Sequence, residues 1–202
     1  MTIDTSQLAL ATTVAHEAVP RGLCVLAVGQ ILRAPARPGT VLRRGVDTVD
    51  AEVRLCHQVD IAASIATRAV EAAMLAAATT ASRGASVDWC LDGALYNRYP
   101  VSGMFRTHTD TSEDPRDPPC VRNRRLTLVC FLNDSVDDGV PSCEGGALVI
   151  YERREGLTQA LTVRPQAGTI VAFDAGFMHE VRPVLRGERF SAVAWLYSNE
   201  ET

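Results

Sequence analysis

The second half of the chain is a succession of short apolar segments separated by turn residues, and this pattern constrains the fold more than any other feature. Eight segments of strand length follow Val87, at 94–99, 103–108, 125–133, 145–151, 160–165, 168–173, 179–185 and 189–197. The connections between them are too short and too rich in proline and glycine for the helices that a doubly wound parallel sheet requires. The pattern therefore predicts an α+β, mainly β chain built as a double-stranded β-helix, or jelly roll.

The first third of the chain has a different periodicity. From Asp47, which can cap a helix, to Gly84, which can end one, apolar residues recur every three or four positions and predict one long amphipathic helix. Residues 22–32 are apolar and of strand length, so we expect a strand there, followed by an exposed loop. No linker composition divides the chain, which predicts a single domain: 1–87 as a helix-rich support packed on one sheet, and 88–202 as the jelly-roll core.

Composition and charge exclude several classes of partner. With a formal net charge of −4, the chain lacks the basic surface of a nucleic-acid-binding protein. It also has no apolar run long enough to span a bilayer and no signal-peptide pattern, so we expect a cytoplasmic chain without membrane contact. The six cysteines form no C-x-x-C pair, and we expect reduced, mostly buried thiols.

Two of the four histidines lie where they could bind a metal ion. His108 and Asp110 are two positions apart at the end of a predicted strand, so their side chains can face the same point. His179 opens a later strand and could add a second imidazole from a facing strand. Two histidines and one carboxylate on one face of an octahedron suit a non-haem Fe(II) centre that activates O₂.

Arg189 follows His179 by ten positions, on the next predicted strand. An arginine inside an apolar barrel is costly unless it meets an anion, and a dicarboxylate co-substrate could supply one. One carboxylate would then bind the guanidinium in a bidentate manner while the other end of the molecule binds the metal. Ser191 faces the same side as Arg189 and could assist through its hydroxyl.

These residues stand in an ordered set of motifs that resembles a known enzyme family. The motifs are YPVSGMFRTHTD, RRLTLVCFLND, EGGALVIY, GTIVAF and HEVRPVLRGERFSAVAW, and they cover about the last 100 residues. The segment resembles the Fe(II)- and 2-oxoglutarate-dependent dioxygenases of the prolyl 4-hydroxylase-like branch. The resemblance implies that His108, Asp110 and His179 are the iron ligands, that Arg189 and Tyr99 bind 2-oxoglutarate, and that Ser191 completes an Arg-x-Ser pattern.

The resemblance also implies a reaction: O₂ and 2-oxoglutarate are consumed, succinate and CO₂ are released, and an unactivated C–H bond is hydroxylated. Asp110 favours hydroxylation over halogenation, because halogenating relatives replace this carboxylate with a small residue. The chain departs from some relatives at Phe131, which has no hydroxyl where they carry an aromatic one. Thr127, on the same strand, could point into the barrel instead.

Each assignment has an alternative. His108 could be a surface residue and His179 a core histidine, Arg189 could pair with Asp174 or Glu180, and Tyr99 could be a packed ring. Two other functions compete with the dioxygenase. One is a non-catalytic jelly-roll binding module, and the other is a zinc-dependent hydrolase or isomerase with the same ligands.

Fold and co-substrate chemistry do not identify the substrate. A small-molecule, carrier-bound or peptide substrate fits the chain, with an amino-acid or prolyl-type residue favoured. The charged loop 111–125 is expected to shape that choice, and the N-terminal helices could form a homodimer face.

Overall fold

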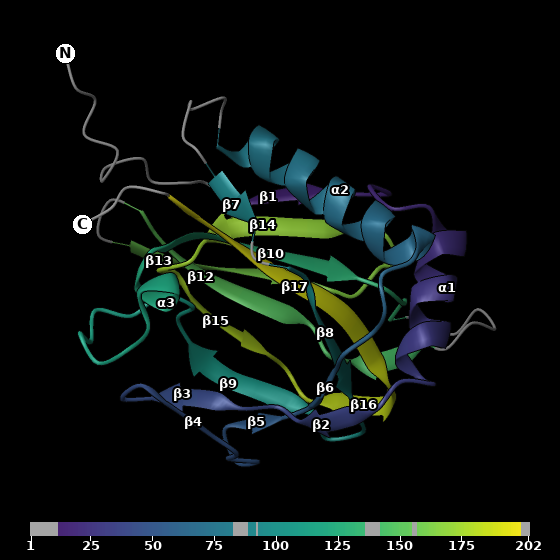
Figure 1. Cartoon of the computed structure of the whole chain (residues 1–202), viewed down its shortest axis with the longest axis horizontal. Helices are drawn as coiled ribbons and strands as arrows, with labels where there is room; N and C mark the ends of the chain where they lie inside the picture. Colours follow the sequence, from purple (N-terminus) through teal and green to yellow (C-terminus); the bar gives the residue numbers. More distant parts are fainter. Residues whose placement is uncertain (1–11, 83–88, 92, 136–141, 155–156, 199–202) are drawn as a thin grey trace.

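A computed structural model describes residues 12–82, 89–91, 93–135, 142–154 and 157–198 of the chain. Two antiparallel sheets form its body, and two helices cover one of them (Figure 1). The larger sheet runs in the order β1 (Thr13–Ala15), β14 (Ile170–Asp174), β10 (Arg124–Phe131), β17 (Arg189–Ser198), β8 (Leu95–Tyr99), β6 (His57–Val59) and β2 (Ala36–Pro38), and β7 (Trp89–Leu91) pairs with β17.

The smaller sheet carries five strands. They run in the order β13 (Leu157–Val163), β12 (Leu148–Arg154), β15 (Met178–Val181), β9 (Met104–His108) and β5 (Arg54–Leu55). Two further strand pairs lie outside these sheets: β11 (Cys143–Gly145) with β16 (Val184–Gly187), and β3 (Val41–Arg43) with β4 (Val46–Thr48). This is the predicted double-stranded β-helix, and all eight predicted strands are present, the seventh of them divided into β15 and β16.

Alternation along β10 shows how one strand serves two cores. Leu126 and Leu128 are fully buried in the cluster under the helices. Val129 and Phe131, on the opposite face, belong to the cluster between the two sheets, which includes Ile150 of β12. Because side chains alternate along a strand, Thr127 lies on that inner face as well. A polar residue is thus placed inside the barrel.

The helices are α1 (Arg21–Ile31), α2 (Ile65–Ala81) and the short α3 (Pro119–Arg122). The helix α2 packs on β10 and β14 and also contacts α1, so the prediction that N-terminal helices cover one sheet is confirmed. No helix in the described part of the chain is long and apolar enough to cross a membrane. The division of the chain at residue 87 remains a prediction.

The predicted long helix from Asp47 is wrong in its first half. The helix α2 begins only at Ile65, where the Ser64 side chain accepts a hydrogen bond from the Thr67 backbone N–H and the Thr67 hydroxyl bonds back to Ser64. The preceding segment forms β4, β5 and β6, which pair with β3, β9, β2 and β8. Strand pairing, in a local hairpin for β4 and with more distant strands for β5 and β6, overrides the helical spacing there. The predicted end at Gly84 lies outside the described residues.

The strand predicted at residues 22–32 is also wrong, because the segment is the helix α1. Its buried residues are Cys24, Ala27, Val28 and Ile31, which follow helical spacing. Pro20 precedes the first turn, where a missing N–H costs nothing. The exposed loop predicted next contains β2 and β3.

The cysteines that the structure describes agree with the expected reduced state. Cys24, Cys56, Cys130 and Cys143 are free and buried, and Cys120 is free and exposed.

Candidate active site

Three of the predicted residues meet at one point inside the barrel. His108 ends β9 and His179 lies on β15, and the two are cross-strand partners in the smaller sheet. The second imidazole therefore comes from a neighbouring strand rather than from a facing one. Asp110 follows the end of β9, where its backbone N–H donates to the carbonyl of Ala175 at 2.9 Å. A bend in the chain, not a continued strand, brings the carboxylate back to the two histidines.

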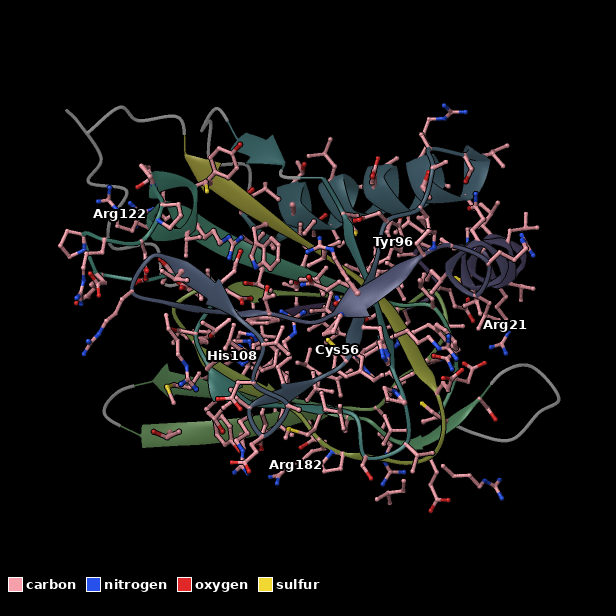
Figure 2. The ribbon with its side chains drawn as sticks, turned by 60° about the horizontal axis from the view of Figure 1, so that its bottom comes forward. Arg21, Cys56, Tyr96, His108, Arg122 and Arg182 are labelled. Atoms are coloured by element: carbon pink, nitrogen blue, oxygen red, sulfur yellow. The ribbon has the colours of Figure 1, made fainter. Side chains whose placement is uncertain are left out.

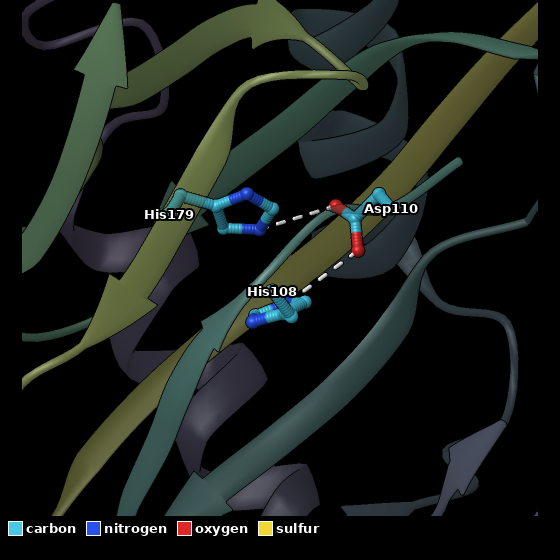
Figure 3. A group of neighbouring side chains, drawn as sticks. All are labelled: His108, Asp110 and His179. Carbon is cyan, nitrogen blue, oxygen red and sulfur yellow. Dashed lines mark ion pairs between the residues drawn. The ribbon is translucent and has the colours of Figure 1, made fainter. Parts of the chain in front are cut away.

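The three side chains converge on a shared space (Figure 3). His108 Nε2 lies 3.6 Å from Asp110 Oδ1, and His179 Nε2 lies 3.4 Å from Asp110 Oδ2. One ligand atom from each residue lies within 4.8 Å of the others. This is the spacing at which three atoms can bind a single metal ion.

Hydrogen bonds fix both imidazoles with Nε2 toward that space. His108 Nδ1 lies 2.8 Å from the carbonyl oxygen of Arg106, and His179 Nδ1 lies 2.9 Å from that of Phe177. A carbonyl oxygen only accepts, so each Nδ1 carries a proton, and in the neutral form of each ring the lone pair is on Nε2. Metal-binding histidines are commonly held in this way.

Electrostatics at the triad keep the carboxylate ionised. Burial alone would raise the pKa of Asp110, but the imidazoles of His179 and His108 outweigh burial and hold that pKa well below its usual range. Burial and the neighbouring His179 lower the pKa of His108 to about 4. Burial also acts to lower the pKa of His179, but the adjacent Asp110 carboxylate reverses the effect and raises it.

Thr127 contacts the triad. The sequence predicted only that its side chain could point into the barrel. Its side chain has no exposed surface, and its Oγ1 donates a hydrogen bond to Asp110 Oδ2 at 2.8 Å. The backbone of Asp110 is held as well, because Arg124 Nη1 donates to its carbonyl oxygen at 3.3 Å. Thr127 is a positioning residue for the carboxylate. Strand alternation was the signal for its direction, but nothing in the sequence indicated its partner.

Arg189 lies on β17 of the larger sheet and is only 1% exposed. Its Nη1 donates to the Ser191 hydroxyl oxygen at 3.0 Å, and the guanidinium carbon lies 4.9 Å from the centre of the Tyr99 ring and 5.1 Å from that of Phe131. Its Nε is buried without a hydrogen-bond partner. Within the described part of the chain, no carboxylate pairs with this guanidinium, whose pKa is lowered by burial.

The two carboxylates that could have neutralised Arg189 are engaged elsewhere. Asp174 Oδ1 accepts from the backbone N–H of Gly176 at 2.8 Å. Glu180 accepts from the Tyr151 hydroxyl at 2.8 Å and pairs with Arg182 at 3.0 Å. Arg189 is thus a buried cation in need of an anion, and the buried Tyr99 beside it has a pKa raised to about 12 by burial, so its phenol keeps its proton.

Two other predicted placements are resolved by the structure. His16 and His57 lie outside the triad, and Cys56 and His57, which fall within the predicted helix from Asp47, lie at β6 instead. Trp195, on β17, is partly exposed, and the guanidinium of Arg124 lies 3.7 Å from its ring centre.

Comparison with known proteins agrees with this geometry. The sequence profile of the 2OG-Fe(II) oxygenase superfamily matches residues 94–197, which is half of the chain and includes all six residues named above as candidates. The chain belongs to this superfamily. Its members use Fe(II), 2-oxoglutarate and O₂.

Relatives by sequence carry the name PKHD-type hydroxylase. The protein from Methylobacterium nodulans is 33% identical over 105 residues, which cover 52% of this chain and 42% of the relative. The protein from Thermosynechococcus vestitus is 34% identical over 104 residues, with the same coverage. The match thus spans less than half the length of these relatives.

Solved structures extend the likeness to the whole fold. A prolyl-4-hydroxylase from Pseudomonas putida has a TM-score of 0.68 and 21% identity, covering 93% of this chain and 92% of that one. A Trichoplax adhaerens prolyl hydroxylase, solved with a peptide fragment of hypoxia inducible factor, has a TM-score of 0.74 and 15% identity, covering 95% and 85%. At this identity the likeness shows the prolyl-hydroxylase-type fold.

The residues of this 2OG-Fe(II) oxygenase fit Fe(II) and 2-oxoglutarate, two of the groups that the superfamily uses. Two imidazoles and one carboxylate, with ligand atoms within 4.8 Å of one another, are the donor set that Fe(II) takes with positions left open. The orphaned Nε and uncompensated charge of Arg189 fit the distal carboxylate of 2-oxoglutarate.

Proposed function

We propose that this chain is an Fe(II)- and 2-oxoglutarate-dependent dioxygenase that hydroxylates an unactivated C–H bond of an amino-acid, prolyl or peptide-type substrate, releasing succinate and CO₂. The observation that carries the proposal is the pairing of the His108, Asp110 and His179 cluster with a buried, anion-free Arg189 inside one barrel. Iron bound to the three ligands would supply the activation of O₂. The substrate is a small molecule, a carrier-bound group or a peptide.

Each residue has a distinct role in this proposal. His108, Asp110 and His179 hold Fe(II) on one side and leave the other positions open. Arg189 binds the distal carboxylate of 2-oxoglutarate and thereby orients it toward the iron, while Ser191 fixes the guanidinium through the 3.0 Å hydrogen bond. Tyr99 contributes a protonated phenol beside the co-substrate.

The geometry of Arg189 favours this function over a zinc-dependent hydrolase. A hydrolase needs only the three metal ligands and a bound water. It provides no reason for a guanidinium that is 1% exposed and has no carboxylate partner among the described residues. Burying an unpaired cation is costly, so an anionic ligand at this position is the better account.

The test is O₂-dependent succinate formation from 2-oxoglutarate after anaerobic loading with Fe(II). We expect succinate from the wild type and its loss in His108→Ala and Arg189→Ala. His16→Ala and Arg37→Ala are matched controls, because His16 is exposed and Arg37 pairs with Asp60 at the surface. Activity that persists with Zn²⁺ alone, or that survives the two site variants, would contradict the proposal.

A further inference from the structure

Arg54 is a second arginine beside the candidate site, and the superfamily resemblance assigns it no role. It lies on β5 at the edge of the smaller sheet, opposite Phe105 of β9. Its guanidinium carbon lies 4.7 Å from the centre of the Phe105 ring, which stacks on His108 with centroids 3.5 Å apart and planes at 17°. Arg54, Phe105 and His108 therefore form a continuous stack that leads to the triad.

Three hydrogen bonds hold the guanidinium of Arg54 in one orientation. Nε donates to Cys56 Sγ at 3.2 Å, Nη1 to the Thr40 carbonyl at 2.8 Å, and Nη2 to Asn97 Oδ1 at 3.0 Å. Asn97 belongs to β8 of the larger sheet, so Arg54 reaches from one sheet to the other. Figure 2 shows Cys56 and His108 in the interior between the layers, whereas Arg182 lies at the edge.

The fixed guanidinium keeps donors for a ligand. Each Nη atom carries two protons, and only one is used on each. The N–H groups that these bonds leave can donate to a carboxylate, and the Tyr99 phenol lies beside them as a further neighbour of the guanidinium. Because the other donors are already anchored, little side-chain entropy remains to be lost on binding.

The charge of Arg54 lacks a compensating partner. No carboxylate in the described residues lies within ion-pairing distance of its guanidinium, and the fully buried Asn97 that it contacts is neutral. Burial alone would lower the pKa of Arg54, but the neighbouring Tyr99, Cys56 and Asp110 outweigh burial, and the net effect is a raised pKa. The guanidinium therefore stays a cation.

The charge balance of the loaded site indicates what would neutralise Arg54. Fe(II) and Arg189 together carry three positive charges, and Asp110 with the two carboxylates of 2-oxoglutarate carries three negative ones. The positive charge of Arg54 is then left over in a partly buried position. One further carboxylate would balance it.

We propose that Arg54 binds the carboxylate of the substrate, and that the substrate is a small amino-acid-type acid. This inference rests on the proposed dioxygenase function. A carboxylate bound at Arg54 stays close to the Phe105 ring, and the stack onto His108 sets how far the rest of the molecule extends toward the metal. Arg54 thus selects for the acid and orients its C–H bonds.

The test compares free L-amino acids, including L-proline, with their primary amides. Succinate formation by the Fe(II)-loaded chain is measured with each compound, and the dissociation constant of the best acid is measured anaerobically in the presence of Fe(II) and 2-oxoglutarate. We expect at least one acid to stimulate turnover above the level without substrate and its amide to do so far less.

The variants are Arg54→Gln and Arg54→Lys, with Arg43→Gln as the control. Arg43 is a surface arginine of β3 that pairs with Asp50 at 2.6 Å, and its exchange should change nothing. In Arg54→Gln we expect the preference for acid over amide, as a ratio of kcat/KM, to fall roughly 10- to 100-fold and acid binding to weaken in parallel. Arg54→Lys keeps the charge and should retain part of the preference.

Four results would overturn the inference about Arg54 alone, provided that the wild type makes succinate. The first three are a panel in which no acid stimulates turnover, equal use of acids and amides, and an unchanged acid preference in a folded Arg54→Gln. A rise in the KM for 2-oxoglutarate without a change in acid preference would also overturn it, because Arg54 would then serve the co-substrate. Failure of the wild type to make any succinate would instead contradict the proposed function.

Discussion

Exchange of Thr127 for valine tests how the barrel holds the carboxylate of Asp110. Valine has nearly the same shape as threonine, so the buried position remains filled, but the 2.8 Å hydrogen bond to Asp110 Oδ2 is lost. The acceptor is ionised and the donor has no exposed surface, so the bond belongs to the strong class, worth about 1.5–3 kcal/mol. If that contribution is realised in the metal-bound state, Fe(II) affinity falls roughly 10- to 100-fold.

The assay is an anaerobic Fe(II) titration against a chromophoric chelator, with thermal unfolding of the metal-free chain as a check of folding. Thr127→Ser is the matched control, because it keeps the hydroxyl and loses only a methyl group. We expect the serine variant to bind Fe(II) within a few-fold of the wild type. A valine variant that binds Fe(II) as tightly as the wild type, or a serine variant that loses as much affinity as valine, would show that the Thr127 hydroxyl does not hold the carboxylate for the metal.

Three further predictions concern the surroundings of Arg189, the core under the helices and the phenol of Tyr99. Gly146→Ala should raise the KM for 2-oxoglutarate, because the new Cβ would lie 2.9 Å from Arg189 Cδ and the backbone φ at Gly146 is +66°. Gly22→Ala is the control, because a Cβ there meets nothing within 4 Å, and equal KM values for the two variants would contradict the prediction. Met74→Ala should lower the free energy of unfolding by about 2–5 kcal/mol and Leu75→Ala by less than about 1 kcal/mol, measured in urea, because Met74 is fully buried and Leu75 is 46% exposed. Burial raises the pKa of Tyr99 to about 12, so the pH profiles of succinate formation by the wild type and Tyr99→Phe should run parallel below about pH 10. A loss of wild-type activity near pH 8 that is absent from the variant would contradict this prediction.

Much of the fold could be predicted from the second half of the sequence, where period-two segments alternate with turn residues. The first third was harder, because its apolar spacing is ambiguous. Residues 46–59 follow a helical spacing, but β4 forms a hairpin with β3, and β5 and β6 pair with strands that lie far away in the sequence. A short apolar run such as 22–32 fits a strand or a buried helix equally well, and packing against the sheet decides in favour of α1.

The metal ligands were predictable because residue type and spacing carry the signal. The sequence placed His108, Asp110 and His179 together, but it could not show that a bend after β9, held by the Ala175 carbonyl, positions Asp110. Thr127 and Arg54 act through contacts across the barrel, to Asp110 and Asn97 respectively. Such contacts depend on how two sheets face each other, which no local pattern contains.

The most direct test of the central claim is the anaerobic binding of 2-oxoglutarate to the chain with and without Fe(II). The account predicts one molecule bound per chain, tight binding only when Fe(II) is present, and loss of binding in both His108→Ala and Arg189→Ala. Binding that does not depend on Fe(II), or that survives either exchange, would contradict the claim that the triad and Arg189 form one site.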